Sequence, residues 1–86
     1  MLTIDISYFA WVRERMGQGG ERVVLPEAVT TARDLIDWLA ARDAAGAAAF
    51  AEPARIRVAI DGAMTTADGK MRNNSEISLF PPVTGG

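Results

Sequence analysis

The chain has 86 residues, which is the size of one small domain, and 49% of them are hydrophobic, which is typical of a chain that folds around a core. Its formal net charge of -2 is small and of the wrong sign for a protein that binds nucleic acid. The absence of cysteine and histidine excludes disulfides, thiol nucleophiles, zinc sites of the usual kind and the commonest general base.

The N-terminal residues predict a strand followed by a short helix. Residues 2–8 (LTIDISY) alternate polar and apolar side chains, and this period of two is typical of a strand with one buried face. The side chains expected to face the core are Leu2, Ile4 and Ile6. Apolar side chains at helical spacing in residues 9–16 then predict a short helix that ends at Gly17.

A glycine-rich loop and a second strand follow. The GQGG sequence of residues 17–20 connects a helix to a strand and contains no lysine, so we interpret it as a turn and not as a phosphate-binding loop. Residues 21–25 (ERVVL) predict a second strand, which ends at Pro26.

The main helix is predicted to begin at Thr31. Its hydroxyl can cap free backbone N–H groups of the first turn, and Asp34 suits the positive end of the helix dipole. The expected buried stripe consists of Ala32, Leu35, Ile36 and Leu39. Residues 43–46 are expected to end or interrupt this helix, and residues 47–51 (AAAFA) to form another helical turn before Pro53.

A strand hairpin is predicted after Pro53. Residues 55–60 (RIRVAI) form its first strand. The side chains expected to face the core are Ile56, Val58 and Ile60. Asp61-Gly62 is a strong signal for a two-residue hairpin turn, and residues 63–66 form a short strand after it.

Two further turns, at Asp68-Gly69 and Asn73-Asn74, precede a last strand at residues 76–80 (EISLF). The order of elements predicts an α+β fold of the β-grasp, or ubiquitin-like, architecture, with a mixed sheet of about five strands packed on one main helix and a short additional helix. We expect a β-grasp domain at residues 1–80 and an extended C-terminal tail at residues 81–86.

The remaining side chains indicate no catalytic or metal site. Asp34 and Asp37 lie near a helix N-terminus, where a solvated role is favoured. Trp11 and Trp38 are expected to be core or partly buried packing residues, since we expect that basic residues do not gather around them. No stretch approaches the roughly 20 apolar residues of a membrane span or resembles the core of a signal peptide, so we expect a cytoplasmic protein.

The sequence FPPVTGG at residues 80–86 predicts a stiff arm. Pro81 and Pro82 have no N–H donors, so sheet pairing must fail there, and their fixed φ keeps the chain extended. Val83 and Thr84 are β-branched and favour the same extended backbone.

The tip of the arm is suited to a narrow channel. Residues 83–86 can reach about 13 Å beyond the prolines, at ~3.3 Å per residue. Gly85 and Gly86 have no side chains and accept any backbone angle that a partner demands. The carboxylate at the tip is a poor electrophile, and becomes useful only when another protein activates it, for instance as an acyl adenylate. This pattern indicates a carrier, although a chain end of this kind can also be simply frayed.

Two phenylalanines are expected near the root of the arm. If Ile77 and Leu79 face the core, Phe80 faces the opposite side of the sheet. Phe9 follows the first strand, and the first and last strands are neighbours in a β-grasp sheet. The pair could form an apolar patch for a partner, or both rings could be covered by the fold.

Two segments, YFAWVRERMG at residues 8–17 and ISLFPPVTGG at residues 77–86, resemble the small subunit of molybdopterin synthase, the MoaD family of ubiquitin-like sulfur carriers. Members typically contain an F-A-x-V-R-E segment after the first strand and end in F-P-P-V-T-G-G. One departure lies at residues 73–76 (NNSE), where the family often has an acidic D-G-D-E-like turn.

The resemblance implies a non-catalytic sulfur donor in molybdenum cofactor biosynthesis. A MoeB-type enzyme would use ATP to adenylate Gly86, and a persulfide donor would convert it to a thiocarboxylate. The large subunit (MoaE type) would then transfer the sulfur to cyclic pyranopterin monophosphate, within a heterotetramer. The implied inserted tail is Gly85, Thr84, Val83, Pro82 and Pro81. The implied partner interface is Phe80, Phe9 and Arg13.

Two alternatives remain open. The chain could be another diglycine-ended carrier or modifier, of the thiamin type or of a Urm type that conjugates to lysines. It could also be a β-grasp interaction module whose tail only anchors it to a partner.

Overall fold

The structure is a computed structural model that describes residues 1–82. In chain order its elements are β1 (Leu2–Tyr8), α1 (Ala10–Met16), β2 (Gly20–Leu25), α2 (Ala32–Arg42), α3 (Ala44–Ala49), the 3-10 helix η1 (Pro53–Arg55), β3 (Arg57–Ile60), β4 (Ala63–Thr65) and β5 (Glu76–Phe80). Within this described part of the chain, every helix is too short or too polar to cross a membrane.

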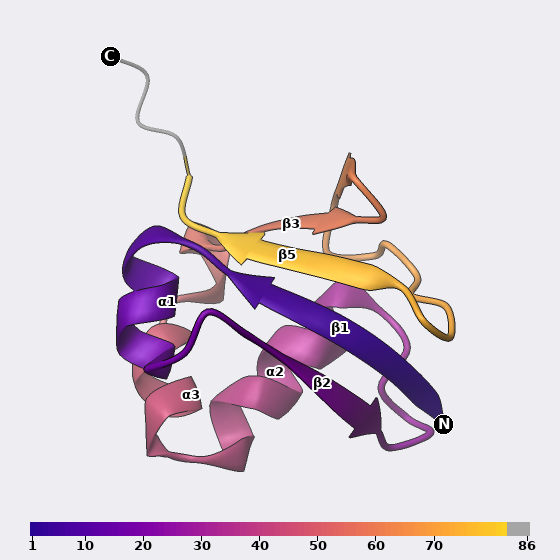
Figure 1. Cartoon of the computed structure of the whole chain (residues 1–86), viewed down its shortest axis with the longest axis horizontal. Coiled ribbons are helices and arrows are strands. Elements are labelled where there is room, and N and C mark those ends of the chain that lie inside the picture. The colour runs from indigo at the N-terminus through magenta and orange to yellow at the C-terminus, as the bar shows by residue number, and fades with distance from the viewer. Residues whose placement is uncertain (83–86) are drawn as a thin grey trace.

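The five strands form one mixed sheet in the order β2-β1-β5-β3-β4. β1 is antiparallel to β2 and parallel to β5, with Tyr8 opposite Leu79. β3 is antiparallel to both β5 and β4. Figure 1 shows α2 crossing behind β1 and β2, so the helices cover one face of the sheet and leave the other open. The predicted β-grasp fold is confirmed.

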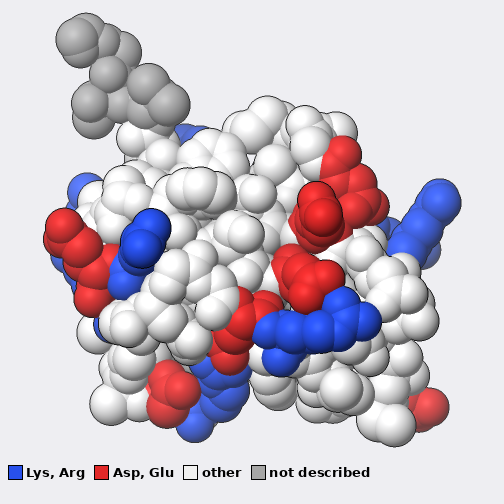
Figure 2. Space-filling model, in the orientation of Figure 1, with Lys and Arg blue, Asp and Glu red and all other residues white. Residues whose placement is uncertain are grey.

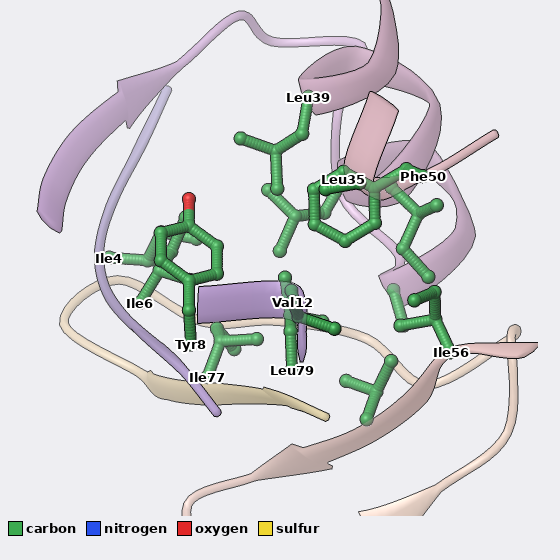
Figure 3. Packing of buried hydrophobic residues seen from close by; sticks show 14 of the residues in the cluster. Ile4, Ile6, Tyr8, Val12, Leu35, Leu39, Phe50, Ile56, Ile77 and Leu79 are labelled. Atoms are coloured by element: carbon green, nitrogen blue, oxygen red, sulfur yellow. The ribbon is translucent and has the colours of Figure 1, made fainter. Parts of the chain in front are cut away.

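The core lies between the covered face of the sheet and the helices. Side chains from β1, β5, α1 and α2 converge there (Figure 3). Large side chains that are less than 2% exposed include Ile4, Tyr8, Val12, Leu35, Leu39, Phe50, Ile77 and Leu79. Each such aliphatic side chain stabilises the fold by about 1.5–3 kcal/mol through burial. The predicted stripe of α2 is confirmed at all four positions.

The start of α2 is fixed by a reciprocal cap. The backbone N–H of Asp34 donates to the Thr31 hydroxyl (3.2 Å), and the backbone N–H of Thr31 donates to the Asp34 carboxylate (3.2 Å). Backbone N–H groups of Thr30 and Thr31 lower the pKa of Asp34 because they stabilise its ionised form. The predicted helix start at Thr31 is confirmed.

The expected break at residues 43–46 is wrong in extent. Asp43 alone is non-helical, and it caps α3 by accepting a hydrogen bond from the N–H of Gly46 (2.7 Å). Gly46 lies inside α3 and is buried. A Cβ at this position would collide with the carbonyl oxygen of Leu39. The glycine therefore permits close packing of α3 on the end of α2 and does not stop a helix.

The start of α1 and the start of β3 each differ slightly from the predicted residue, whereas the end of α1 and the hairpin turn agree with the prediction. α1 begins at Ala10 with Phe9 as its N-cap, and it ends at Gly17, whose φ is 75° as predicted for a left-handed cap. β3 begins at Arg57 and not at residue 55, because the chain first makes the η1 turn. The hairpin turn at Asp61-Gly62 is confirmed, with φ of 51° and 84°.

Candidate functional site

The end of β5 brings two phenylalanines together on the open face of the sheet. Phe80 is the last residue of β5 and lies opposite Arg57 of β3. On the other side, the backbone N–H of Phe9 donates to the carbonyl of Leu79 (3.1 Å), which places Phe9 level with Phe80. Pro81 has no N–H to continue this ladder, so pairing ends here. The predicted proximity of Phe9 to the last strand is confirmed.

Both rings are accessible to a partner. Phe9 is 48% exposed and Phe80 is partly buried. Met64 of β4, which is 63% exposed, faces the same side of the sheet. We call Phe9 and Phe80 the apolar patch. Because Phe9 is this exposed, the alternative in which the fold covers both rings is excluded.

Small uncharged residues lie next to the apolar patch on the open face, and Arg57 is the charged residue in register with Phe80. The next row across the sheet contains small residues in register, namely Gly20, Ser7, Ser78 and Ala59, and it ends at Met64 on β4. Charged side chains begin one row further along, where Arg22 pairs with Asp5 (2.7 Å). Figure 2 shows this uncharged surface below the grey residues, with acidic groups farther along the sheet. A surface of this composition is suited to association with another protein.

Arg13 lies one helical turn from Phe9. Its backbone N–H donates to the carbonyl of Phe9 (3.3 Å), and its guanidinium lies against Gly19, in a groove between α1 and the glycine-rich loop. Ala10, with φ of 52°, turns the chain from Phe9 into α1 in a left-handed conformation that residues with a Cβ rarely adopt. Such strained residues are often found at functional sites.

A polar network connects the end of β1 to β2 and α2. The Tyr8 hydroxyl donates to Glu21 (2.7 Å), and Arg42 of α2 donates to both Glu21 oxygens (2.9 and 2.8 Å). Hydrogen bonds from Arg42 lower the pKa of Glu21, and burial raises the pKa of Tyr8. The network connects the residue before Phe9 to the main helix. This network was not predicted from the sequence. A signal for it is that Glu21, a charged residue, occupies a core-facing position of the second strand and therefore requires a partner.

The tryptophans are partly buried against the core, as predicted, but the expectation about their neighbours is wrong. The Arg15 guanidinium lies 4.4 Å from the Trp11 ring centroid and that of Arg55 lies 5.5 Å from it. Arg42 lies 5.3 Å from the Trp38 ring. Arg55 is distant in sequence, so only the fold brings it to Trp11. The contact between Arg55 and Trp11 joins η1 to α1.

The remaining predicted site residues can be placed only in part. Pro81 and Pro82 are partly buried at the end of β5. Val83, Thr84, Gly85 and Gly86 lie outside the described residues. Within residues 1–82, the acidic side chains form no group of three or more that could hold a metal ion.

Comparison with known proteins identifies relatives of similar length. The model of the ThiS family matches residues 6–86. A Haemophilus influenzae protein named "Molybdopterin synthase sulfur carrier subunit" is 31% identical over 83 residues, which cover 96% of this chain and 99% of that one.

Solved structures share the fold. A putative molybdopterin converting factor, subunit 1, from Pyrococcus furiosus has a TM-score of 0.78 at 26% identity, and the match covers 96% of this chain and 100% of that one. SAMP1 from Haloferax volcanii has a TM-score of 0.72 at 24% identity, covering 98% and 99%. The second likeness shows the fold alone.

Proposed function

The chain belongs to the ThiS family of β-grasp sulfur carriers, and we propose that it is the sulfur-carrier subunit of a molybdopterin synthase. The observation that carries this proposal is the 31% identity to a protein of that name over nearly the whole of both chains. The arm sequence FPPVTGG and the apolar patch at its root support it.

The proposed chemistry takes place at Gly86. A carboxylate is ionised at neutral pH, with an ordinary pKa near 3.5, and does not react with sulfur nucleophiles. A MoeB-type enzyme would therefore join the carboxylate to AMP from ATP and release pyrophosphate. The terminal sulfur of a persulfide donor would then attack the carbonyl and release AMP, which leaves an acyl disulfide. A thiol would reduce its S–S bond, and the products are the thiocarboxylate and a disulfide.

The domain itself would supply recognition and reach. In the proposed complex, the large subunit (MoaE type) contacts Phe9, Phe80 and Arg13, and residues 81–86 enter its active site. Aromatic side chains in the middle of an interface commonly contribute most of the binding energy. Because Phe80 is the last residue of β5, docking on the apolar patch would fix where the arm begins. The thiocarboxylate would then donate sulfur to cyclic pyranopterin monophosphate.

Deletion of Gly86 distinguishes a carrier from an anchor, and an assay of the intact chain with the large subunit distinguishes this carrier from a thiamin-type one. A carrier without Gly86 should bind the large subunit with nearly unchanged affinity and transfer no sulfur. If the tail is only an anchor, the deletion should abolish binding. A carrier for a thiamin-type pathway should form the thiocarboxylate with an activating enzyme, yet fail to convert cyclic pyranopterin monophosphate when the large subunit is present.

A further inference from the structure

A pocket of about 370 Å³ opens at the edge of the sheet, between the start of β3, the end of β4, α2 and η1. We call it the edge pocket. Three side chains of the core form its floor, namely Ile36, Ile56 and Val58, which are 4–6% exposed. Figure 3 shows Ile56 at the end of the core that lies away from Ile4 and Ile6. Pockets that bind ligands commonly have volumes of about 300–1,000 Å³.

The edge pocket exists because β3 and β4 stop pairing before the chain reaches α2. Val58 and Thr65 are the last paired residues. The chain then leaves the sheet, since the carbonyl of Ala67 accepts a hydrogen bond from the backbone N–H of Arg33 (3.0 Å). The hydrogen-bonded turn of η1 forms the opposite wall. Backbone hydrogen bonds thus hold both walls, and the pocket is preformed.

The rim of the edge pocket is positively charged. Arg33 and Arg57 both line it, and among residues 1–82 its lining contains no carboxylate. The Arg33 Nε donates to Asp37 (3.2 Å), which lies one helical turn further along α2. The Arg57 Nη1 donates to the carbonyl of Ala54 (3.0 Å).

Both arginines retain donors for a ligand. A guanidinium has five N–H donors. Within residues 1–82, Arg33 uses only its Nε and Arg57 only its Nη1 in hydrogen bonds. The remaining N–H groups can bind a carboxylate at the mouth of the pocket, and an arginine can do so through two parallel hydrogen bonds.

An apolar floor below a cationic rim selects an apolar group that has a carboxylate beside it. A protein presents both where an acidic residue is next to leucine or another large apolar residue. The edge pocket is also continuous with the apolar patch, because Arg57 is in register with Phe80. A protein that covers Phe80 would therefore have its next residues close to the pocket, which favours a protein segment over a free small molecule.

We propose that the edge pocket binds an acidic segment of a partner protein. One large apolar side chain of that segment occupies the floor, and the flanking carboxylates bind Arg33 and Arg57. The choice of a protein as the occupant rests on the proposed function, in which a partner covers the apolar patch. The affinity for an acidic, apolar chain depends only on the residues of the pocket.

The test uses the full chain labelled with nitrogen-15 and follows its amide chemical shifts at pH 7. The probe is the capped tripeptide acetyl-Glu-Leu-Glu-amide. Acetyl-Glu-Ser-Glu-amide lacks the apolar side chain, and acetyl-Lys-Leu-Lys-amide reverses the charge. Hexanoate supplies a carboxylate on an apolar chain without a peptide. The chain carries a net charge of -2, so general attraction favours the lysine peptide and works against the proposed result.

Two variants locate the binding charge. Arg33→Gln removes one cation from the rim. Arg72→Gln is the matched control, because Arg72 is also exposed but lies in the loop before β5 and outside the lining of the pocket. Both variants change the net charge equally, so a difference between them reports the position of the charge.

We expect acetyl-Glu-Leu-Glu-amide to give saturable shifts at lining residues such as Ile36, Val58 and Thr66. Its dissociation constant should be at least about fivefold lower than those of the other three ligands. Arg33→Gln should weaken its binding at least about fivefold, and Arg72→Gln less than about twofold.

The inference is overturned if these amides do not shift, or if the two arginine variants lose affinity equally. A smaller preference over either control peptide also overturns it, because floor and rim would then not act together. Binding of hexanoate as tight as that of the peptide would contradict a protein segment as the occupant. The assay contains no activating enzyme and no large subunit, so each result is independent of sulfur transfer at Gly86.

Discussion

Phe9 lies level with Phe80 because its N–H donates to the Leu79 carbonyl (3.1 Å) and so extends the parallel register of β1 and β5 by one residue. The two motifs at opposite ends of the sequence therefore meet at one place. The arm leaves the sheet at that place, since Pro81 cannot continue the pairing. In the proposed function, these two residues connect recognition by the domain to delivery by the arm.

Truncation of Phe80 should weaken binding to the large subunit. We expect Phe80→Ala to cost roughly 1–3 kcal/mol, a factor of about 5–150 in dissociation constant, measured by titration calorimetry. Val24→Ala is the control, because Val24 is also exposed on the open face (59%) but lies on the edge strand β2. An unchanged dissociation constant for Phe80→Ala would assign that ring to packing alone.

A methyl group at Gly85, near the tip of the arm, should impair activity without changing the stability of the fold. Gly85→Ala should leave the thermal unfolding midpoint unchanged, because the arm is expected to lie outside the core. It should slow either activation by the adenylating enzyme or sulfur transfer, because a Cβ does not fit a channel shaped for glycine. Single-turnover assays of both steps would locate the defect. Full activity in both would contradict the narrow-channel argument.

Gly46→Ala should strongly destabilise the domain. The new Cβ would collide with the Leu39 carbonyl oxygen, and forcing α3 away from α2 should cost on the order of 2–4 kcal/mol. Chemical denaturation measures the free energy of unfolding. The control is Ala48→Gly on an exposed position of the same helix, which should cost only about 1 kcal/mol. A stabilised Gly46→Ala variant would mean that the two helices do not pack as described.

The Glu21–Arg42 pair should make stability depend on pH in a defined direction. The pKa of Glu21 is lowered in the folded state, so its contribution is present above the unfolded pKa of about 4.3 and is lost as pH falls through the folded value. Glu21→Gln should therefore reduce the free energy of unfolding at pH 7, by about 1–3 kcal/mol, and by less at pH ~3, which lies below the unfolded pKa. Denaturation curves at both pH values measure the difference.

Glu27→Gln is the control for that comparison. Glu27 is exposed and makes no ion pair among residues 1–82. Its substitution should change stability little at either pH. An equal loss for Glu21→Gln at pH 7 and pH 3 would show that the ionised carboxylate is not what stabilises the network.

The sequence predicts the elements whose signals are local. The alternation in residues 2–8, the cap at Thr31 and the stripe of α2 each depend on neighbours within a few residues, and each is confirmed. Residues 43–46 are expected to end or interrupt the main helix, but the role of Gly46 depends on the Leu39 carbonyl oxygen that packs against it, which the local sequence does not indicate.

The partners of charged residues could not be predicted in the same way. An inward-facing Glu21 requires a partner, but the sequence does not say that α2 brings Arg42 to it. Arg55 reaches Trp11 for the same reason, through the tertiary fold. The pairing of β1 with β5 does follow from the order of elements, and it was enough to place Phe9 near the last strand.

The central claim is that Gly86 carries sulfur. The most direct measurement is intact mass spectrometry of the protein after incubation with ATP, a MoeB-type enzyme, a persulfide source and a thiol reductant. We predict a mass gain equal to the replacement of one oxygen by sulfur, localised to Gly86 and absent without ATP. No gain, with an enzyme that is active on a known carrier and with the tail intact, would contradict the carrier role.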